Sequence, residues 1–289
     1  MSNNIPQEIL DFCNATCGEL ASFRPASGGC INNGGKIEAG KGTFFMKWND
    51  SKSFPRMFTV ESKGLSLLAE TQCLQIPEVV EVYEGAHHSC IVMEYIESGP
   101  RTKTYWTDLA RGLACLHKTS ANQYGLKHNN YIGSLQQYNN HEDHWIDFFI
   151  NNRLQPQVKL AMDHGRLNRS DLKKVSRFEK VIAGILNEEK PALVHGDLWS
   201  GNLMIGPLGN PVLIDPAVAY VHRETELAFT QLFGGFDREF YDAYQSIFPM
   251  ESGYQERFDI YNVYPLLVHV NLFGGGYYQQ AMSVVSRFS

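Results

Sequence analysis

The stretch that decides the fold reads H-G-D-L-W-S-G-N at residues 195–202, and I-D-P follows at residues 214–216. These residues supply three groups that phosphoryl transfer from ATP requires. The carboxylate of Asp197 can orient a substrate hydroxyl, and Asn202, five residues later, can hold a metal ion. Asp215 can then bridge that metal to phosphates. Each residue alone is more often a turn or cap residue, but the complete set with its spacing favours catalysis.

The residues between Asn202 and Asp215 predict a β-hairpin. Residues 203–205 are apolar, residues 206–210 (G-P-L-G-N) are rich in turn formers, and residues 211–214 read as the returning strand. Because a hairpin brings its two ends together, we expect Asn202 and Asp215 to meet at its open end. Two oxygen ligands there suit Mg²⁺, which fills its octahedron with water and phosphate oxygens.

The composition is that of an ordinary globular protein, with 289 residues, 43% apolar and 19% charged, and a net charge of −6. The absence of a long basic run argues against nucleic-acid binding. No apolar run has the length of a membrane-spanning helix, and the N-terminus does not resemble a secretory signal, so we expect a cytoplasmic protein. The six cysteines show no C-x-x-C spacing, which favours reduced thiols over disulfides or a zinc site.

The chain divides into a β-rich part and a helical part. Up to about Ile96 it contains short strand candidates and one expected helix over residues 57–70, whereas helical periodicity dominates from Thr104 onward. We therefore expect an α+β, two-lobed, protein-kinase-like fold. The N-terminal nucleotide-binding lobe would span residues 1–96, and a helical C-terminal lobe with the catalytic loop and substrate pocket would span residues 97–289.

Three features of the first part fit a nucleotide site. The glycine-rich segment at residues 27–35 precedes the first strand pair, and glycines let backbone N–H groups approach phosphates closely. A strand at residues 43–48 carries Lys47, and the next helix carries Glu61, which is favoured over Glu70 as the partner of Lys47. Phosphate loop, lysine, glutamate and catalytic loop follow one another in the order found in kinases.

The strand at residues 91–96 (I-V-M-E-Y-I) has the position of a kinase hinge, where the backbone binds the adenine edge of ATP. Position along the chain, and not residue type, carries this prediction. The expected nucleotide-binding residues are Gly28, Gly29, Cys30, Ile31, Asn32, Lys47, Glu61, Met93, Glu94, Tyr95 and Ile96.

In these residues the chain resembles the fructosamine kinase (ketosamine kinase) family, a relative of aminoglycoside phosphotransferases and, more distantly, of protein kinases. The string at residues 195–202 is the most specific match. Four further matches extend the resemblance over nearly the whole chain: G-C-I-N at 29–32, Y-I-G-S at 131–134, F-F-I-N-N-R-L-Q-P-Q at 148–157, and E-L-A through F-G-G-F at 226–236. The resemblance implies ATP-dependent phosphorylation of the third-carbon hydroxyl of a ketosamine. The 3-phosphate is unstable and falls off, so the reaction leads to deglycation.

The resemblance also implies roles for individual residues. Asp197 resembles the catalytic base, and Asn202 and Asp215 resemble the metal ligands. Lys47 resembles the phosphate-binding lysine and Glu61 its partner. The chain departs from the family at two positions outside this set, His222 and Asn129, where the family often has acidic residues.

The acceptor site and Cys30 are predicted with alternatives open. Trp199 offers a flat apolar wall for a sugar ring, or else fills the core beneath the loop. His269 and Asn271 in the last helical segment are expected to line the acceptor site. Cys30 in the phosphate-covering loop is either a reactive thiol or a small side chain tucked beneath the loop. The protein would accordingly be a monomer or a redox-sensitive homodimer.

Two other functions remain open at this stage. The first is a small-molecule kinase of the same fold that acts on an aminoglycoside, choline or another hydroxyl. The second is a nucleotide-binding regulator without turnover, which the complete set of Lys47, Asp197, Asn202 and Asp215 argues against. For a ketosamine kinase, the substrate could be a small-molecule ketosamine or a glycated protein.

Overall fold

The computed structural model describes residues 5–26 and 32–289 and contains two compact units. The first unit comprises Met1–Tyr105 and Met204–Asp215, and the second comprises Trp106–Leu203 and Pro216–Ser289. The sequence predicted a single boundary after residue 96. In the structure, the hairpin that follows the catalytic loop also belongs to the first unit. Asp215 therefore belongs with the β-rich part of the chain, whereas Asp197 and Asn202 belong with the helical part.

The first unit is built on a five-stranded antiparallel sheet with the strand order β1-β2-β3-β5-β4. Its elements are α1 (Gln7–Cys17), β1 (Leu20–Pro25), β2 (Asn33–Ala39), β3 (Gly42–Asp50), α2 (Met57–Glu70), β4 (Val79–Glu84) and β5 (His88–Glu94). The helix predicted over residues 57–70 is confirmed as α2.

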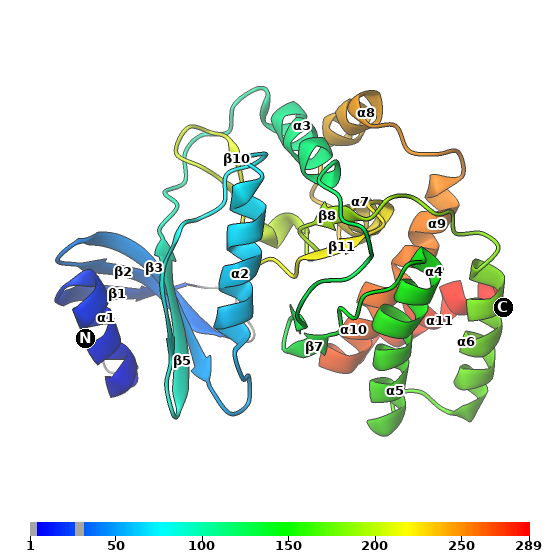
Figure 1. The fold of residues 1–289 in the computed structure, drawn as a ribbon, viewed down its shortest axis with the longest axis horizontal. Coiled ribbons are helices and arrows are strands. Elements are labelled where there is room, and N and C mark those ends of the chain that lie inside the picture. The colour runs from blue at the N-terminus through cyan, green and yellow to red at the C-terminus, as the bar shows by residue number, and fades with distance from the viewer. Residues whose placement is uncertain (1–4, 27–31) are drawn as a thin grey trace. The chain divides into compact units, whose positions relative to one another are not determined.

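Successive residues of the central strand face opposite sides of the sheet, and a helix covers each side. Met46 and Trp48 of β3 lie in the cluster that contains Cys13 of α1. Phe45, the residue before Met46, packs against the cluster that contains Phe58 of α2. Figure 1 shows α1 and α2 on the two faces of this sheet. Lys47 lies between Met46 and Trp48 along β3, so the alternation places its side chain on the α2 side of the sheet.

The predicted hairpin is confirmed as β9 (Leu203–Ile205) and β10 (Pro211–Leu213), which pair with each other. Gln75, which follows α2, ties this hairpin to the first unit. Its carbonyl accepts a hydrogen bond from Leu213 N at 3.1 Å, and its side-chain oxygen accepts one from Asn210 Nδ2 at 2.7 Å. These bonds hold the end of β10, and so the start of the Asp215 turn, beside the segment that follows α2.

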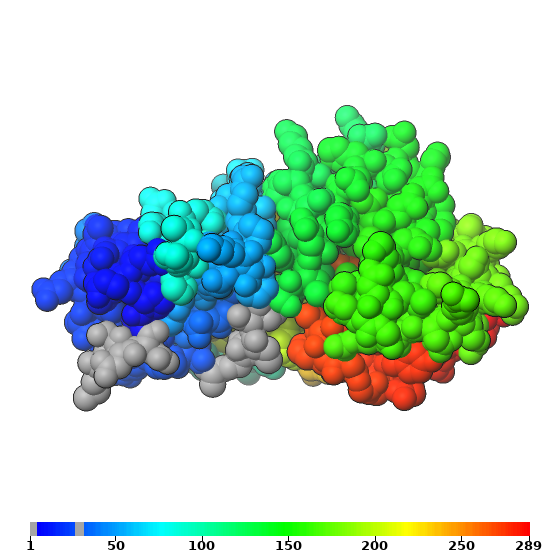
Figure 2. All heavy atoms as spheres, turned by 90° about the horizontal axis from the view of Figure 1, so that it is seen from below, coloured from blue at the N-terminus to red at the C-terminus, as the bar shows by residue number. Residues whose placement is uncertain are grey.

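The second unit is mainly helical. Its helices are α3 (Tyr105–His117), α4 (Trp145–Phe148), the π-helix η1 (Phe149–Leu154), α5 (Gln155–Asp163), α6 (Arg169–Ile182), the 3₁₀ turn η2 (Ser200–Asn202), α7 (Glu224–Leu232), α8 (Arg238–Ile247), α9 (Tyr254–Tyr261), α10 (Val263–Phe273) and α11 (Tyr277–Arg287). Two short antiparallel pairs accompany them: β6 (Asn130–Ile132) with β7 (Leu135–Gln137), and β8 (Ala192–Val194) with β11 (Ala219–Val221). Helix α10 packs against α5 and α11, and Figure 2 shows the green surface of α5 beside the orange-red surface of the last helices.

No helix in the described ranges is both long and apolar enough to cross a membrane. Cys13, Cys17 and Cys90 are buried free thiols. Cys73 and Cys115 are disulfide-bonded, so the expectation of reduced thiols was wrong for these two residues. Scattered spacing along the sequence does not reveal which cysteines the fold places in bonding positions. Cys30 lies outside the described residues.

Candidate active site

Lys47 stands at the centre of a buried ion cluster in the first unit. Its Nζ contacts the carboxylate of Glu61 and lies 2.8 Å from Oδ1 of Asp215. The residue is only 7% exposed. Burial by itself lowers the pKa of Lys47, but the carboxylates of Asp215 and Glu61 outweigh it and hold that pKa above its ordinary value. Lys47 is therefore a fixed cation, and Glu61 is its partner from α2.

Asp215 occupies an unusual turn directly after β10. Its φ is 55°, in the left-handed region that residues other than glycine rarely adopt. Its side chain is 45% exposed, in contrast to that of Lys47. Oδ1 accepts the bond from Lys47, and within the described residues no hydrogen-bond partner is recorded for Oδ2. Backbone strain of this kind is found where a side chain must be held in one direction for function.

Asp197 and Asn202 are brought together within the second unit. Asn202 Nδ2 donates to the backbone oxygen of Asp197 at 2.8 Å and to Oδ2 of the same residue at 2.9 Å. The turn η2 (Ser200–Asn202) brings Asn202 back toward Asp197, and Asn202 is only 7% exposed. Because both amide protons point toward Asp197, the Oδ1 of Asn202 is the atom that remains to ligate a cation.

The backbone at Gly196, directly before Asp197, leaves no room for a side chain. Its φ is +84°, and a Cβ at this position would lie 2.1 Å from the backbone oxygen of Ala217. Ala217 N in turn donates to the backbone oxygen of His195 at 2.9 Å. The backbone of residues 195–196 thus lies directly against Ala217, and only glycine fits at position 196.

A series of buried polar side chains is hydrogen-bonded to the same loop. Glu226 Oε1 accepts a hydrogen bond from Gly196 N at 2.8 Å, and its Oε2 lies 2.8 Å from His117 Nε2. His117 Nδ1 lies 2.8 Å from the hydroxyl of Tyr244. Burial raises the pKa of Glu226, but the hydrogen bond and charge of His117 outweigh it and lower that pKa below its ordinary value. Glu226 is therefore an anion that orders the backbone next to Asp197.

Sequence reasoning did not assign roles to Glu226 and His117. Glu226 lies in the E-L-A string at residues 226–228, so the resemblance marked the position without indicating its contacts. His117 lies at the end of a helix, 109 residues before Glu226. No local pattern connects the two residues.

Trp199 is 40% exposed, so it does not fill the core beneath the loop. Its indole lies over Gly201, where an added Cβ would come within 2.3 Å of two indole carbons. The absence of a side chain at Gly201 therefore lets the indole lie directly against the backbone there. An exposed indole two residues from Asp197 is compatible with the predicted sugar-binding wall.

The two substrate residues predicted on α10 have different surroundings. His269 joins an aromatic cluster, with its ring 4.8 Å from Phe233 and 4.9 Å from Tyr277. Burial lowers the pKa of His269, so the imidazole is neutral at pH 7. Asn271 is only 6% exposed, and its Nδ2 donates to the backbone oxygen of Gln157 at 2.9 Å and to Oε1 of that residue at 2.8 Å. Asn271 thus bridges α10 and α5. Contact of His269 and Asn271 with the substrate stays a prediction.

The other predicted nucleotide residues are only partly described. Gly28, Gly29, Cys30 and Ile31 lie outside the described residues. Asn32 Oδ1 accepts a hydrogen bond from Asn49 Nδ2 at 3.0 Å. In the expected hinge, Met93 and Ile96 are buried, and Lys36 Nζ lies 4.8 Å from the ring centre of Tyr95. Glu94 N donates to the backbone oxygen of Glu78 at 2.8 Å, so this N–H is not available to adenine.

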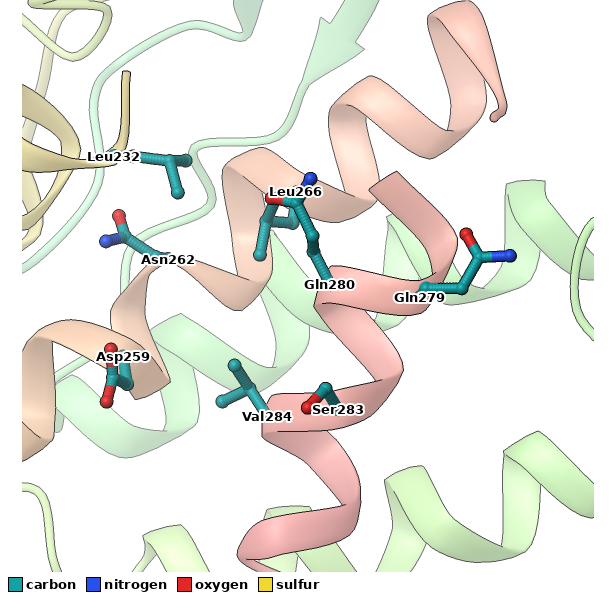
Figure 3. A pocket seen from close by; sticks show the side chains of 8 residues that line it. All are labelled: Leu232, Asp259, Asn262, Leu266, Gln279, Gln280, Ser283 and Val284. Carbon is teal, nitrogen blue, oxygen red and sulfur yellow. The ribbon is translucent and has the colours of Figure 1, made fainter. Parts of the chain in front are cut away.

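Two further features bear on ligands. Within the described ranges no group of three or more His, Cys, Asp or Glu side chains could hold a metal ion. Mg²⁺ requires no such group, because one or two protein ligands suffice when phosphates and water complete its shell. Figure 3 shows a pocket in the second unit that is lined by Leu232, Asp259, Asn262, Leu266, Gln279, Gln280, Ser283 and Val284. None of these residues belongs to the predicted site.

Comparison with known proteins identifies relatives over the full length of the chain. The family model described as fructosamine kinase matches residues 2–288. A "probable ketoamine kinase" of Synechocystis is 40% identical, and the match covers 97% of this chain and 96% of the relative. The "protein-ribulosamine 3-kinase, chloroplastic" of Arabidopsis thaliana is 34% identical over 93% of this chain and 83% of its own length.

Solved structures support the same relationship and the predicted fold class. A "putative fructosamine-3-kinase" from Thermobifida fusca matches with a TM-score of 0.87 and 27% identity, over 97% of this chain and 98% of that one. The aminoglycoside phosphotransferase APH(4)-Ia, in a complex with AMP-PNP and hygromycin B, matches with a TM-score of 0.65 at 14% identity. That match covers 97% of this chain and 98% of the phosphotransferase, and it shows the fold alone. The two-lobed α+β, kinase-like fold is thereby confirmed.

Proposed function

The chain belongs to the fructosamine kinase family, and from this membership we propose that it transfers the γ-phosphoryl group of ATP to the third-carbon hydroxyl of a ketosamine. The observation that carries the proposal is the Asp197–Asn202 pair inside H-G-D-L-W-S-G-N, in a chain that the family matches over residues 2–288. Because the 3-phosphate is unstable, the reaction frees the amine from its sugar and serves deglycation.

Asp197 is the proposed catalytic base. Its carboxylate accepts the proton of the acceptor hydroxyl as the hydroxyl oxygen bonds to the γ-phosphorus, while the bond from that phosphorus to the bridging oxygen of ADP breaks. Asn202 holds the Asp197 carboxylate through Oδ2, and Glu226 holds the adjacent backbone through Gly196 N. The base is therefore positioned before the acceptor binds, which lowers the entropic part of the barrier.

Lys47 and Glu61 are the proposed phosphate-binding pair, because a buried cation held by a helix glutamate is the arrangement that kinases use for the α- and β-phosphates. The proposed Mg²⁺ ligands are those predicted from the sequence: the exposed carboxylate of Asp215 in the first unit, and Oδ1 of Asn202 in the second, are oxygen donors of the kind that Mg²⁺ prefers. The ion, when bound, would neutralise charge on the phosphates. A structural relative bound to AMP-PNP supports ATP as the nucleotide.

On the acceptor side, we propose that the exposed indole of Trp199 packs against the C–H face of the sugar. The relative named protein-ribulosamine 3-kinase supports a ketosamine attached to a protein as one substrate. Small-molecule ketosamines have the same reacting group and are included in the proposal.

The proposed location is cytoplasmic. The protein would be a monomer that forms a Cys30-linked dimer on oxidation, which a non-reducing gel of wild type and Cys30→Ala would test.

The experiment that tests the function is an acceptor panel with Mg·ATP. Fructosyl-lysine, ribulosyl-lysine, a glycated protein, choline and an aminoglycoside are compared by ADP release, and ³¹P NMR locates the phosphate. We expect turnover with at least one ketosamine and a phosphate on its third carbon. Turnover only with choline or the aminoglycoside would overturn the proposal. Nucleotide binding without turnover on any acceptor would instead indicate a regulator.

A further inference from the structure

Arg153 is a buried cation outside the catalytic set. It belongs to the π-helix η1 and is only 5% exposed. Its guanidinium carbon lies 4.7 Å from the ring centre of Phe148 and 5.5 Å from that of Tyr264. Burial lowers the pKa of Arg153 to about 10, so it still carries its charge at pH 7. π-helical turns are uncommon and often occur at functional sites.

The recorded partners of this cation are neutral oxygens. In the part of the chain that the structure describes, no carboxylate forms a salt bridge with Arg153; its guanidinium donates to the backbone oxygens of Tyr138 and Asn152 and to Oδ1 of Asn139. A buried charge that is paired only with dipoles is costly. A cation in such surroundings is expected to have a role that a neutral side chain could not perform.

That role is visible in the amides that follow. Arg153 Nη2 donates to Asn139 Oδ1 at 2.9 Å, and Asn139 Nδ2 donates to Asn130 Oδ1 at 2.9 Å. Gln137 Nε2 donates to the same Asn130 Oδ1 at 2.9 Å and to the backbone oxygen of Ala217 at 3.0 Å. A chain of hydrogen bonds therefore runs from the π-helix to the backbone directly after Asp215-Pro216.

The arginine determines the direction of this chain. A guanidinium can only donate, so Asn139 must turn its oxygen toward Arg153 and its NH₂ toward Asn130. Asn130 then presents its oxygen to Gln137, and its own Nδ2 donates to the backbone oxygen of Val218 at 2.9 Å. Backbone oxygens of His128, Val218 and Ala217 accept from Asn139, Asn130 and Gln137 and favour the same orientation. Loss of the donor at position 153 would leave Asn139 Oδ1 without this partner and loosen the anchored end of the chain of bonds.

The chain of bonds ends at the catalytic loop. Ala217, whose oxygen Gln137 holds, donates its own N–H to the oxygen of His195, two residues before Asp197. The hydroxyl of Tyr264 donates to Gln137 Oε1 at 2.8 Å. Burial raises the pKa of Tyr264 to about 12, and the charge of Asp197 contributes to the rise, which places this phenol within electrostatic range of the base.

We propose that Arg153 is a positioning residue for phosphoryl transfer, acting on the Asp197 loop through Asn139, Asn130, Gln137 and Ala217. The inference rests on the proposed function for its kinetic readout, since Arg153 itself need not touch the acceptor. It predicts that loss of Arg153 disturbs the placement of Asp197 and leaves the Lys47–Glu61 cluster of the first unit unchanged.

The first test compares Arg153→Ala with Arg177→Ala, which removes an exposed arginine from α6. We expect kcat with the best ketosamine of the panel to fall about 10- to 100-fold in Arg153→Ala, because small misplacements of reacting groups have effects of that size. KM for ATP should change less than threefold, and guanidinium chloride at millimolar concentration should restore part of kcat. Hydrogen exchange of the peptide covering residues 193–199 should become faster, and Arg177→Ala should match wild type in every readout.

The second test uses Tyr264→Phe, which removes one hydroxyl and keeps the ring. Tyr264→Phe should lower kcat with the ketosamine while leaving KM for ATP nearly unchanged, and the fall in kcat should be smaller than in Arg153→Ala. If Arg153→Ala fails to fold, this variant decides the question alone, and a wild-type kcat would overturn the proposal. A folded Arg153→Ala protein with wild-type kcat and exchange would also overturn it. If wild type itself turns over no ketosamine, the proposed function fails, while the exchange comparison still tests the positioning role.

Discussion

Replacing Gly196 with alanine tests whether the backbone beside Asp197 must lie as tightly against Ala217 as the structure shows. The φ of +84° costs an alanine about 1–2 kcal/mol by itself. The added Cβ would also lie 2.1 Å from the oxygen of Ala217, whereas ordinary contacts begin at 3.4 Å. The difference of about 1.3 Å must be taken up by backbone on both sides, because no flexible side chain is involved.

A displacement of this size next to Asp197, the proposed base, should affect turnover strongly. A misplacement of about 1 Å can lower the rate about 10²-fold, which corresponds to about 2.7 kcal/mol in the barrier. We therefore expect kcat of Gly196→Ala to fall about 100-fold with a ketosamine acceptor. The KM for ATP should change little, because Lys47 and Glu61 belong to the other unit.

Gly165 provides the matched control. It has a similar φ of +67°, but no atom lies within 4 Å of an added Cβ. Gly165→Ala therefore carries the cost of the left-handed backbone without the collision, and we expect a lower Tm with normal kcat. Thermal unfolding and steady-state kinetics of both variants separate the two effects. A Gly196→Ala protein with normal kcat would refute the geometry deduced for this loop.

Three further predictions concern Asp197, Asp215 and His222. Asp197→Asn should bind Mg·ATP normally by calorimetry while kcat falls about 10²–10⁴-fold, because the amide keeps the shape but cannot accept the hydroxyl proton; near-normal kcat would remove Asp197 from its role. Asp215→Ala should abolish productive Mg·ATP binding, so activity that still rises normally with Mg²⁺ would place the metal elsewhere. Burial lowers the pKa of His222 to about 4, and its Nε2 is 4.0 Å from Glu189, too far for a hydrogen bond. The neutral imidazole thus contributes stability that is present above the ordinary pKa of about 6.5 and is lost as pH falls toward 4. Denaturant unfolding of His222→Gln should show a shallower loss over that window, and an unchanged slope would contradict the assignment.

Local sequence patterns predicted the elements that carry the candidate site. The apolar and turn-forming residues at 203–214 were sufficient to predict the β9–β10 hairpin, and helical periodicity was sufficient to predict α2. The pairing of Lys47 with Glu61 followed from their order along the chain and is present in the structure. These features depend on residues close in sequence or on a familiar order of elements, which is the information a single sequence contains.

Contacts between distant residues were not predictable in the same way. Glu226 and His117 pair across 109 residues, and nothing near either residue distinguishes it from an ordinary helix position. The π-helix around Arg153 adds one residue to a turn, which an average period of 3.6 does not reveal. The exposed indole of Trp199 lies against Gly201, and the sequence alone did not indicate this contact.

The distribution of these contacts has a mechanistic consequence. Lys47, Glu61 and Asp215 form one cluster inside the first unit, and Asp197 with Asn202 and its supports forms another inside the second. Each set is held by hydrogen bonds and ion pairs from its own unit. The hydrogen bonds described for the proposed base come from the second unit, and those of the proposed phosphate-binding cluster come from the first. The β9–β10 hairpin lies between Asn202 and Asp215 along the chain. Phosphoryl transfer depends on positioning more than on covalent chemistry by the protein. Contacts within each unit order the proposed base and the proposed phosphate-binding groups, and these contacts include pairs separated by 109 and 168 residues along the chain.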